Sequence, residues 1–335
     1  MGTTRRQTLK ALIAFGAAGA LVSPATAALA EVAAGAGRIP DPPPARPLPE
    51  PEPEAAAEEP DGQVAGGRDR NDHLTAPVTL NGRGPYPFIV DTGASISCVA
   101  HDLALELNLP IQSERQVHTI VGSTPQPVAM VDELQIGVRR ARKMSALALK
   151  LVQPGVQGVL AVDWLKGQRL TLNFAANRLE FEQSRDERSA PGVVVVPARR
   201  RHGQLTIVDA DLGDHRISAM IDSGSEISLC NSHLLDLLDR KRSVVERKRI
   251  EMVTIIGEVF SGELVMLPFL RLGGMHLGNV PVVHSDTHVF QVWGLSDKPA
   301  VLLGMDLLRQ FRAVSLDFGR SQVRFDLPPG ASTAA

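Results

Sequence analysis

The sequence predicts a mainly β protein of two similar lobes, each β-barrel-like with one short helix and related by a pseudo-twofold axis. Short runs of Val, Ile, Leu and Phe, bounded by Gly, Pro and Asn, recur through residues 73–328, as is typical of strands joined by turns. The second half of this region also repeats the first. Because the period is domain-sized, gene duplication explains the repeat better than a solenoid does.

Six pairs of matched segments carry the repeat. Their offset is 131 residues at the start and grows to 144 at the end, so the second copy contains insertions. The pairs are Leu74-Thr75 and Leu205-Thr206, Ile89-Val90-Asp91-Thr92-Gly93 and Met220-Ile221-Asp222-Ser223-Gly224, Ile96-Ser97 and Ile227-Ser228, Thr119-Ile120-Val121-Gly122 and Thr254-Ile255-Ile256-Gly257, Leu160-Ala161-Val162-Asp163-Trp164-Leu165 and Leu303-Gly304-Met305-Asp306-Leu307-Leu308, and Leu172-Asn173-Phe174 and Leu316-Asp317-Phe318. We therefore expect lobes at residues 73–188 and 189–328, followed by a tail at 329–335.

One helix per copy is expected shortly after each Asp-Thr/Ser-Gly triplet. In the first copy it covers residues 101–107, and Pro110 ends it. In the second copy Asn231 or Ser232 caps the helix. Three leucines of that helix share one face: Leu234, Leu235 and Leu238.

The first 72 residues differ in composition from the rest. Arg5 and Arg6 precede a short, weakly apolar stretch, which is similar to a twin-arginine export signal over residues 1–30, with cleavage after Ala27 or Ala30. We expect a periplasmic or secreted protein without stable membrane insertion, or a membrane-anchored one if the signal is not cleaved. Residues 31–72, rich in Pro, Ala and Glu, are expected to form a disordered linker.

Composition narrows the classes of function and ligand. The formal net charge of -2 gives no overall field that favours nucleic acid. Cys98 and Cys230 are the only cysteines, so a disulfide scaffold and a zinc ribbon are excluded, and both thiols are expected to be buried and unpaired. His284, Asp286 and His288 alternate as metal ligands on a strand can, but we expect a solvated loop there. No metal or cofactor is predicted.

The candidate catalytic residues are Asp91 and Asp222, each at the end of an apolar strand. A pseudo-twofold axis would place the two carboxylates around one water molecule. Like charges that close cannot both ionise, so the pair shares a proton. The ionised carboxylate can then act as a base on the water while the protonated one polarises a carbonyl.

The residues beside the two aspartates are expected to shape the site. Gly93 and Gly224 let the backbone turn tightly after each aspartate. The hydroxyls of Thr92 and Ser223 can hydrogen-bond across to the opposite turn and so fix the pair.

Two motifs resemble the active-site turns of the pepsin and retropepsin clan: Asp91-Thr92-Gly93-Ala94-Ser95 and Asp222-Ser223-Gly224-Ser225-Glu226. This clan also has a hydrophobic-hydrophobic-Gly element that packs behind each turn. Leu302-Leu303-Gly304 fits that element, whereas Val159-Leu160-Ala161 fits except at Ala161, where the clan usually has Gly. The resemblance covers roughly residues 74–327 and implies a bilobal acid-protease fold of two fused retropepsin-like lobes.

The resemblance implies an aspartic endopeptidase that hydrolyses a polypeptide in a cleft between its lobes. Because both half-sites lie on one chain, a monomer is expected. Flap hairpins are implied around Gly122 and Gly257, although ordinary edge hairpins fit the same residues. The hydroxyl of Ser225, matched by Ala94 in the first turn, is expected to donate to Asp222 and leave the shared proton on Asp91.

Two alternatives stay open. The chain can be a catalytically silent peptide-binding module of the same fold, or a protease that dimerises lobe by lobe. His-Glu-x-x-His and Gly-x-Ser-x-Gly motifs, which would indicate other hydrolases, are absent from the sequence.

Overall fold

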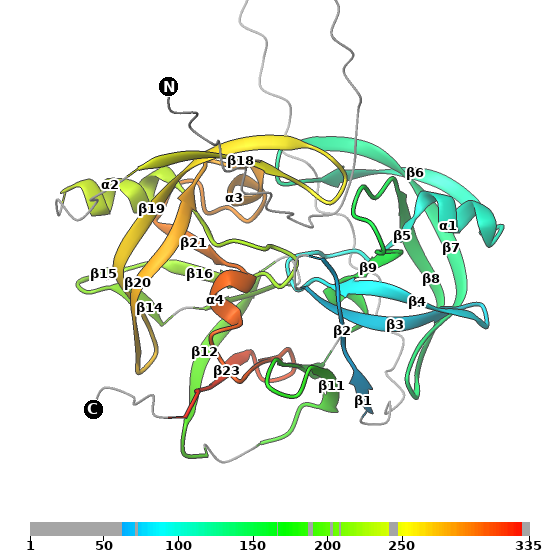
Figure 1. Ribbon diagram of the computed structural model, residues 1–335, viewed down its shortest axis with the longest axis horizontal. Helices are drawn as coiled ribbons and strands as arrows, with labels where there is room; N and C mark the ends of the chain where they lie inside the picture. Colours follow the sequence, from blue (N-terminus) through cyan, green and yellow to red (C-terminus); the bar gives the residue numbers. More distant parts are fainter. Residues whose placement is uncertain are drawn as a thin grey trace, which may run out of the picture. The chain divides into compact units, whose positions relative to one another are not determined.

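The computed structural model describes residues 62–70, 73–165, 167–186, 190–201, 204–207, 209–240 and 247–329. In these residues strands dominate and helices are short (Figure 1). The expected signal peptide and most of the expected linker lie outside the described residues, as does nearly all of the tail. None of the described helices is both long and apolar enough to cross a membrane.

The first lobe is built on one sheet, in which β3 pairs with β7 as well as with its neighbours in the order given. In sheet order the strands are β2 (Gly67–Arg68), β3 (Leu74–Leu80), β4 (Arg83–Val90), β9 (Gly158–Leu160), β5 (Cys98–Ala100), β8 (Arg139–Leu149), β7 (Ser123–Ile136) and β6 (Ile111–His118). The expected helix after the first triplet is α1 (His101–Glu106).

The second lobe repeats this order of strands. The series β16-β21-β17-β20-β19-β18 has the same pairing as β4-β9-β5-β8-β7-β6. Its strands are β16 (Ser218–Ile221), β21 (Ala300–Leu303), β17 (Leu229–Cys230), β20 (Met275–His284), β19 (Val259–Leu272) and β18 (Lys248–Val253), with β13 (Gln204–Ile207), β14 (Ala210–Leu212) and β15 (His215–Arg216) beside them. The predicted mainly β, two-lobed fold is confirmed.

A sheet shared by the two lobes joins them on the side opposite the β6–β7 and β18–β19 hairpins (Figure 1). In order it contains β1 (Gly62–Ala65), β11 (Arg178–Gln183), β10 (Gln168–Asn173), β22 (Ala313–Asp317), β23 (Gln322–Asp326) and β12 (Val193–Arg201). Strands β10 and β22, one from each copy, pair antiparallel with Leu170 opposite Leu316. Both leucines are buried, so this pairing extends one core across the two copies.

The end of the expected linker differs from the prediction. Residues 62–70 carry strands β1 and β2 rather than disordered chain. Strand β1 pairs with the edge of β11, and Val64 reaches the main core with only 7% of its surface exposed. A short strand held by a neighbouring edge needs little apolar content of its own, which is why composition alone missed it.

The helices agree with the prediction in part. Helix α2 (Ser232–Arg240) begins after Asn231, whose Oδ1 accepts a hydrogen bond from the Leu234 N–H at 3.1 Å. The three leucines predicted to share a face, Leu234, Leu235 and Leu238, are buried. Three short helical turns were not predicted: η1 (Val162–Trp164), α3 (His288–Val292) and α4 (Met305–Leu308). The loop expected around Asp286 is present at residues 285–287, and α3 follows it because Val289, Phe290 and the following Trp293 bury their side chains.

If β1 contributes to the core as described, Val64→Ala should lower the free energy of unfolding by roughly 1–2 kcal/mol, since it removes two methyl groups from a buried site. Urea denaturation measures this. Val138→Ala is the matched control, because that side chain is 62% exposed and its truncation should change little. Equal stability of the Val64→Ala variant and the wild type would contradict the docking of β1.

Candidate active site

Each Asp-Thr/Ser-Gly turn directly follows a strand at the centre of its lobe. Strand β4 runs parallel to β9, and β16 runs parallel to β21. The Asp91 N–H donates to the Leu160 carbonyl at 2.8 Å, and the Asp222 N–H donates to the Leu303 carbonyl at 3.0 Å. The downstream hydrophobic elements therefore hold both turns from behind.

The two carboxyl groups lie against each other's turns. A Cβ added at Gly93 would come within 2.5 Å of Asp222 Cγ, and one at Gly224 within 2.3 Å of Asp91 Cγ. Any larger residue at either position would displace the opposite carboxylate. Asp91 and Asp222 are only 1% and 0% exposed.

Thr92 and Ser223 form the expected hydrogen bonds across the pseudo-twofold axis. The Thr92 hydroxyl donates to the Ile221 carbonyl at 3.0 Å, and the Ser223 hydroxyl donates to the Val90 carbonyl at 2.7 Å. Each oxygen also accepts a backbone N–H from the opposite turn, at 3.0 and 3.1 Å. Four buried hydrogen bonds thus fix the distance between the turns.

Within each turn, backbone N–H groups bind one oxygen of the carboxylate. Asp91 Oδ1 accepts from Gly93 at 2.8 Å and Ala94 at 3.0 Å, and Asp222 Oδ1 accepts from Gly224 at 2.9 Å. Both Oδ2 atoms are buried and accept no hydrogen bond from the described residues. These are the oxygens left to bind a water molecule or substrate.

The environment raises both carboxyl pKa values. Burial, followed by the charge of Asp222, raises the pKa of Asp91 well above its usual range. Burial also raises the pKa of Asp222, to about 6, and this rise is opposed by the neighbouring Asp91 carboxyl, by backbone hydrogen bonds within the turn and by the charge of His73. The pair therefore retains a proton in mild acid, and its two carboxyl groups titrate as one coupled unit.

The predicted role of the Ser225 hydroxyl is wrong. It donates to the Ile227 carbonyl at 2.6 Å, and because a hydroxyl has a single hydrogen, it cannot also donate to Asp222. Ser225 is fully buried inside its own lobe, where this carbonyl is the acceptor within reach.

Ala161 takes the place of Gly without backbone strain. Its φ and ψ are -90° and -175°, nearly those of Gly304 at -90° and -176°, and this is extended backbone that any residue adopts. Both residues donate their N–H to a serine hydroxyl at 3.0 Å. A Cβ at Gly304 would instead lie 2.5 Å from the Ile227 carbonyl, so only the second lobe needs the glycine.

Two serine–aspartate pairs behind the turns were missed in the sequence. Ser97 Oγ donates to Asp163 Oδ1 at 2.7 Å, and Ser228 Oγ donates to Asp306 Oδ1 at 2.8 Å. All four residues stand inside the matched segments of the repeat, which was the signal that could have identified them. These serines are the ones that accept the Ala161 and Gly304 N–H groups, so the pairs brace the elements behind the carboxylates.

The two predicted hairpins are present, and each tip crosses to the other lobe. Ile120, at the tip of β6–β7, is fully buried in a cluster that otherwise belongs to the second lobe, and its carbonyl accepts the His288 N–H at 2.9 Å. Ile255, at the tip of β18–β19, is buried in a cluster of the first lobe, and its carbonyl accepts the Val152 N–H at 2.8 Å. Gly257 occupies a left-handed position, with a φ of +88°.

A histidine pair closes the first of these crossings. His118 Nδ1 lies 2.9 Å from His288 Nε2, and the rings stack with centroids 5.1 Å apart. Burial, and then the proximity of His288, lowers the pKa of His118. Two imidazoles in this contact cannot both be protonated without repulsion.

The alternating His284, Asp286 and His288 do not come together. His284 and Asp286 both contact Ser232 at the start of α2, while His288 contacts His118. In the part of the chain that the structure describes, no three His, Cys, Asp or Glu side chains form a group that could hold a metal ion.

Both cysteines, which the structure describes, are buried and free, as predicted. Burial raises the pKa of the Cys98 thiol to about 12 and also raises that of Cys230. Neither thiol is set up as a nucleophile.

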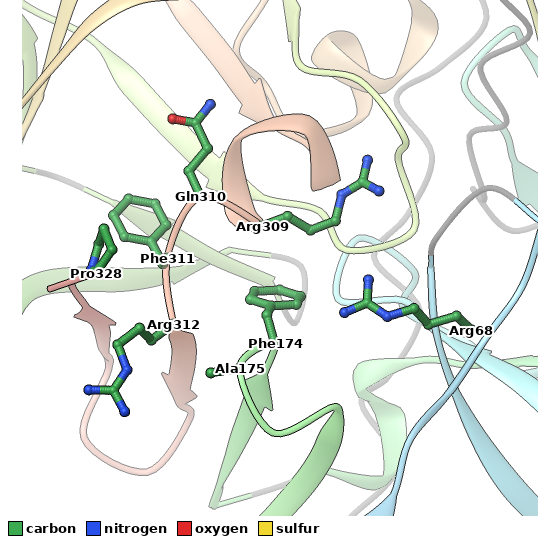
Figure 2. Close-up of a pocket in the computed structure, with 8 residues that line it drawn as sticks. All are labelled: Arg68, Phe174, Ala175, Arg309, Gln310, Phe311, Arg312 and Pro328. Carbon is green, nitrogen blue, oxygen red and sulfur yellow. The ribbon is translucent and has the colours of Figure 1, made fainter.

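A cavity of about 370 Å³ lies elsewhere in the molecule, where three arginines surround two phenylalanines (Figure 2). The residues are Arg68, Arg309, Arg312, Phe174 and Phe311. None of its lining residues comes from either Asp-Thr/Ser-Gly turn, so this cavity is not the candidate active site.

Comparison with known families agrees with this geometry. The aspartyl protease family matches residues 76–164 and 208–307, which together make up more than half of the chain and include both turns. The chain belongs to the aspartyl protease family. No curated protein sequence matches it. Among solved structures it is similar to conglutin gamma, a basic 7S globulin from lupine seeds, with a TM-score of 0.49, 11% identity, and coverage of 80% of this chain and 95% of that one.

In this member of the aspartyl protease family, the histidine pair should make the first hairpin crossing sensitive to acid. Because the pKa of His118 is lowered from 6.5, the crossing should be at full strength above pH 6.5 and weaken as the pH falls below it. Hydrogen exchange can measure this through the His288 N–H, which is bound to Ile120. Its protection should fall in acid relative to that of the Val152 N–H, the matching bond at the second crossing.

In His118→Gln the ratio of the two protection factors should no longer depend on pH over this range. A wild-type ratio that stays constant between pH 7.5 and 5.5 would contradict a role for the histidine pair.

Proposed function

We propose that this protein is an aspartic-type endopeptidase whose catalytic dyad is Asp91 and Asp222. The observation that supports it is the pair of buried carboxyl groups, one from each lobe, each pressed against the glycine of the other's turn. Two carboxylates this close share one proton, and the raised pKa values extend that state into mild acid. Family membership supports a protease-type function in general.

In this mechanism Asp222 acts as the base on a water molecule between the carboxylates. Asp91, which carries the proton, polarises the peptide carbonyl and stabilises the developing oxyanion. The water attacks the carbonyl carbon, and the proton taken by Asp222 later passes to the leaving amine. The bonds made by Thr92 and Ser223 keep the two carboxyl groups in register through these steps.

We also propose that the two hairpins act as flaps. Both tips are bound to the opposite lobe, and both carboxyl groups have almost no exposed surface, so we expect a polypeptide to enter after a tip is released. An extended substrate can then pair with the released hairpin strands by β-augmentation.

A catalytically silent peptide-binding module is the second candidate. The observation that favours it is the same closure: with both tips bound, the dyad of the described structure is inaccessible. Proteolysis separates the two candidates, because a silent module would bind polypeptide without cleaving it.

We further propose that the protein acts outside the cytoplasm as a monomer. Arg5 and Arg6 support export by the twin-arginine route, although residues 1–30 lie outside the described part of the chain. One chain supplies both turns, which is why a monomer suffices.

Cleavage of a denatured protein substrate in mild acid tests the enzyme proposal. Asp91→Asn and Asp222→Asn should each lower the rate by about 10²–10⁴-fold, since either change removes the acid–base pair. Pepstatin should inhibit the wild type, and activity should sediment with the monomer. Asp102→Asn is the control, because its carboxylate is at the surface. Full cleavage by either dyad variant would reject the mechanism.

Export is tested separately in cells. Replacing both Arg5 and Arg6 by Lys should leave a full-length precursor in the cytoplasm, because the paired arginines are the recognised element. Immunoblots of cytoplasmic and periplasmic fractions measure the distribution, with Lys10→Arg as the control. Unchanged export of the double variant would exclude the twin-arginine route.

A further inference from the structure

His73, directly before β3, is almost completely buried and bound to a carboxylate. Its Nδ1 lies 2.8 Å from Asp69 Oδ2, and its backbone N–H donates to Asp69 Oδ1 at 2.9 Å. His73 is 1% exposed, and the side chain of Asp69 is 2% exposed. The amide of Gln153 also donates to Asp69 Oδ2. The carboxylate therefore holds the imidazole ring in one orientation.

The bond between His73 Nδ1 and Asp69 determines whether Nε2, the other ring nitrogen, carries a hydrogen. A carboxylate oxygen can only accept, so Nδ1 carries the hydrogen of a neutral ring. Nε2 is buried and has no hydrogen-bond partner among the described residues. In the neutral ring Nε2 carries a lone pair and can only accept a hydrogen bond, whereas in the protonated ring it carries a hydrogen and donates.

The repeat shows where the ring lies. His73 corresponds to Gln204 at the offset of 131 residues that also relates Asp91 to Asp222. The strand registers agree, because Thr75 pairs with Ile89 and Thr206 pairs with Met220. Gln204 crosses to the first turn, where its Nε2 donates to the Gly93 carbonyl at 2.8 Å. The pseudo-twofold axis thus puts His73 against the second turn, which holds Asp222.

The electrostatics of Asp222 agree with this placement. The charge of His73 lowers the pKa of Asp222, against the effect of burial. No charge at the corresponding position lowers the pKa of Asp91, because Gln204 is a neutral amide. The titratable groups that face the ring are Asp69 from its own loop and Asp222 from the opposite turn; Gln153 is neutral.

We propose that the Asp69–His73 pair tunes the dyad: a positive charge on the His73 ring makes Asp222 the carboxylate that ionises and leaves the shared proton on Asp91. His73 is a positioning residue for charge and takes no part in bond making. This role rests on the proposed peptidase function only for its effect on rate. It also supplies the asymmetry that the Ser225 hydroxyl does not.

The test is His73→Gln, which gives both lobes the same residue and so uses a side chain that this position accommodates in the second copy. NMR titration of ¹³C-labelled aspartate carboxyl carbons, without substrate, should show that the pKa of Asp222 rises by about half a unit to one unit. The signal is identified by its loss in Asp222→Asn. The acid limb of the pH–activity profile should move up by the same amount.

Asp69→Asn should shift the same signal in the same direction, and the double variant should add little, because the pair acts through one charge. His101→Gln is the matched control, since His101 pairs with Asp102 at 3.5 Å on the surface and should shift nothing. If His73→Gln does not fold, the Asp69→Asn titration decides.

An Asp222 titration that is unchanged in both His73→Gln and Asp69→Asn, or equally shifted in His101→Gln, would overturn the proposal. A wild type that cleaves nothing, together with a shifted titration in His73→Gln, would reject the peptidase function and leave the role of His73 intact.

Discussion

Two carboxyl groups buried against each other are the constraint on which the rest of this structure depends. Each occupies the space that a side chain would fill at the opposite glycine, and neither can move away without losing backbone hydrogen bonds of its own turn. Burying two like charges together is unfavourable unless one of them is neutral. The two carboxyl groups therefore share one proton. The turns need a rigid support to keep the two groups in contact.

The support is a set of paired interactions repeated in both lobes. Thr92 and Ser223 tie the turns across the axis, and a serine–aspartate pair braces the element behind each turn. The pairing of β10 with β22 joins the two lobes on the side opposite the hairpins. Because the same contacts occur twice, the geometry of the site comes from the symmetry of the fold.

The two lobes also depart from exact symmetry, and these differences affect how the site binds protons. An exact twofold would give the two aspartates equal proton affinity, and no member of the pair would be assigned as base. His73 opposite Gln204 breaks that equality with one charge, and the His118–His288 contact makes one hairpin crossing respond to acid. Ala161 opposite Gly304 is an asymmetry without such a consequence, because the backbone is extended in both.

The sequence by itself determined the two-lobed β fold, the two turns and the start of α2, because each depends on local pattern or on a repeat along the chain. It did not determine β1, whose place depends on a strand edge more than a hundred residues away. Nor did it place the hairpin tips in the opposite cores. These contacts join residues from different copies, and only tertiary structure brings such residues together. The prediction for the Ser225 hydroxyl was wrong for the same reason, because the atoms around a hydroxyl in space determine which acceptor it binds.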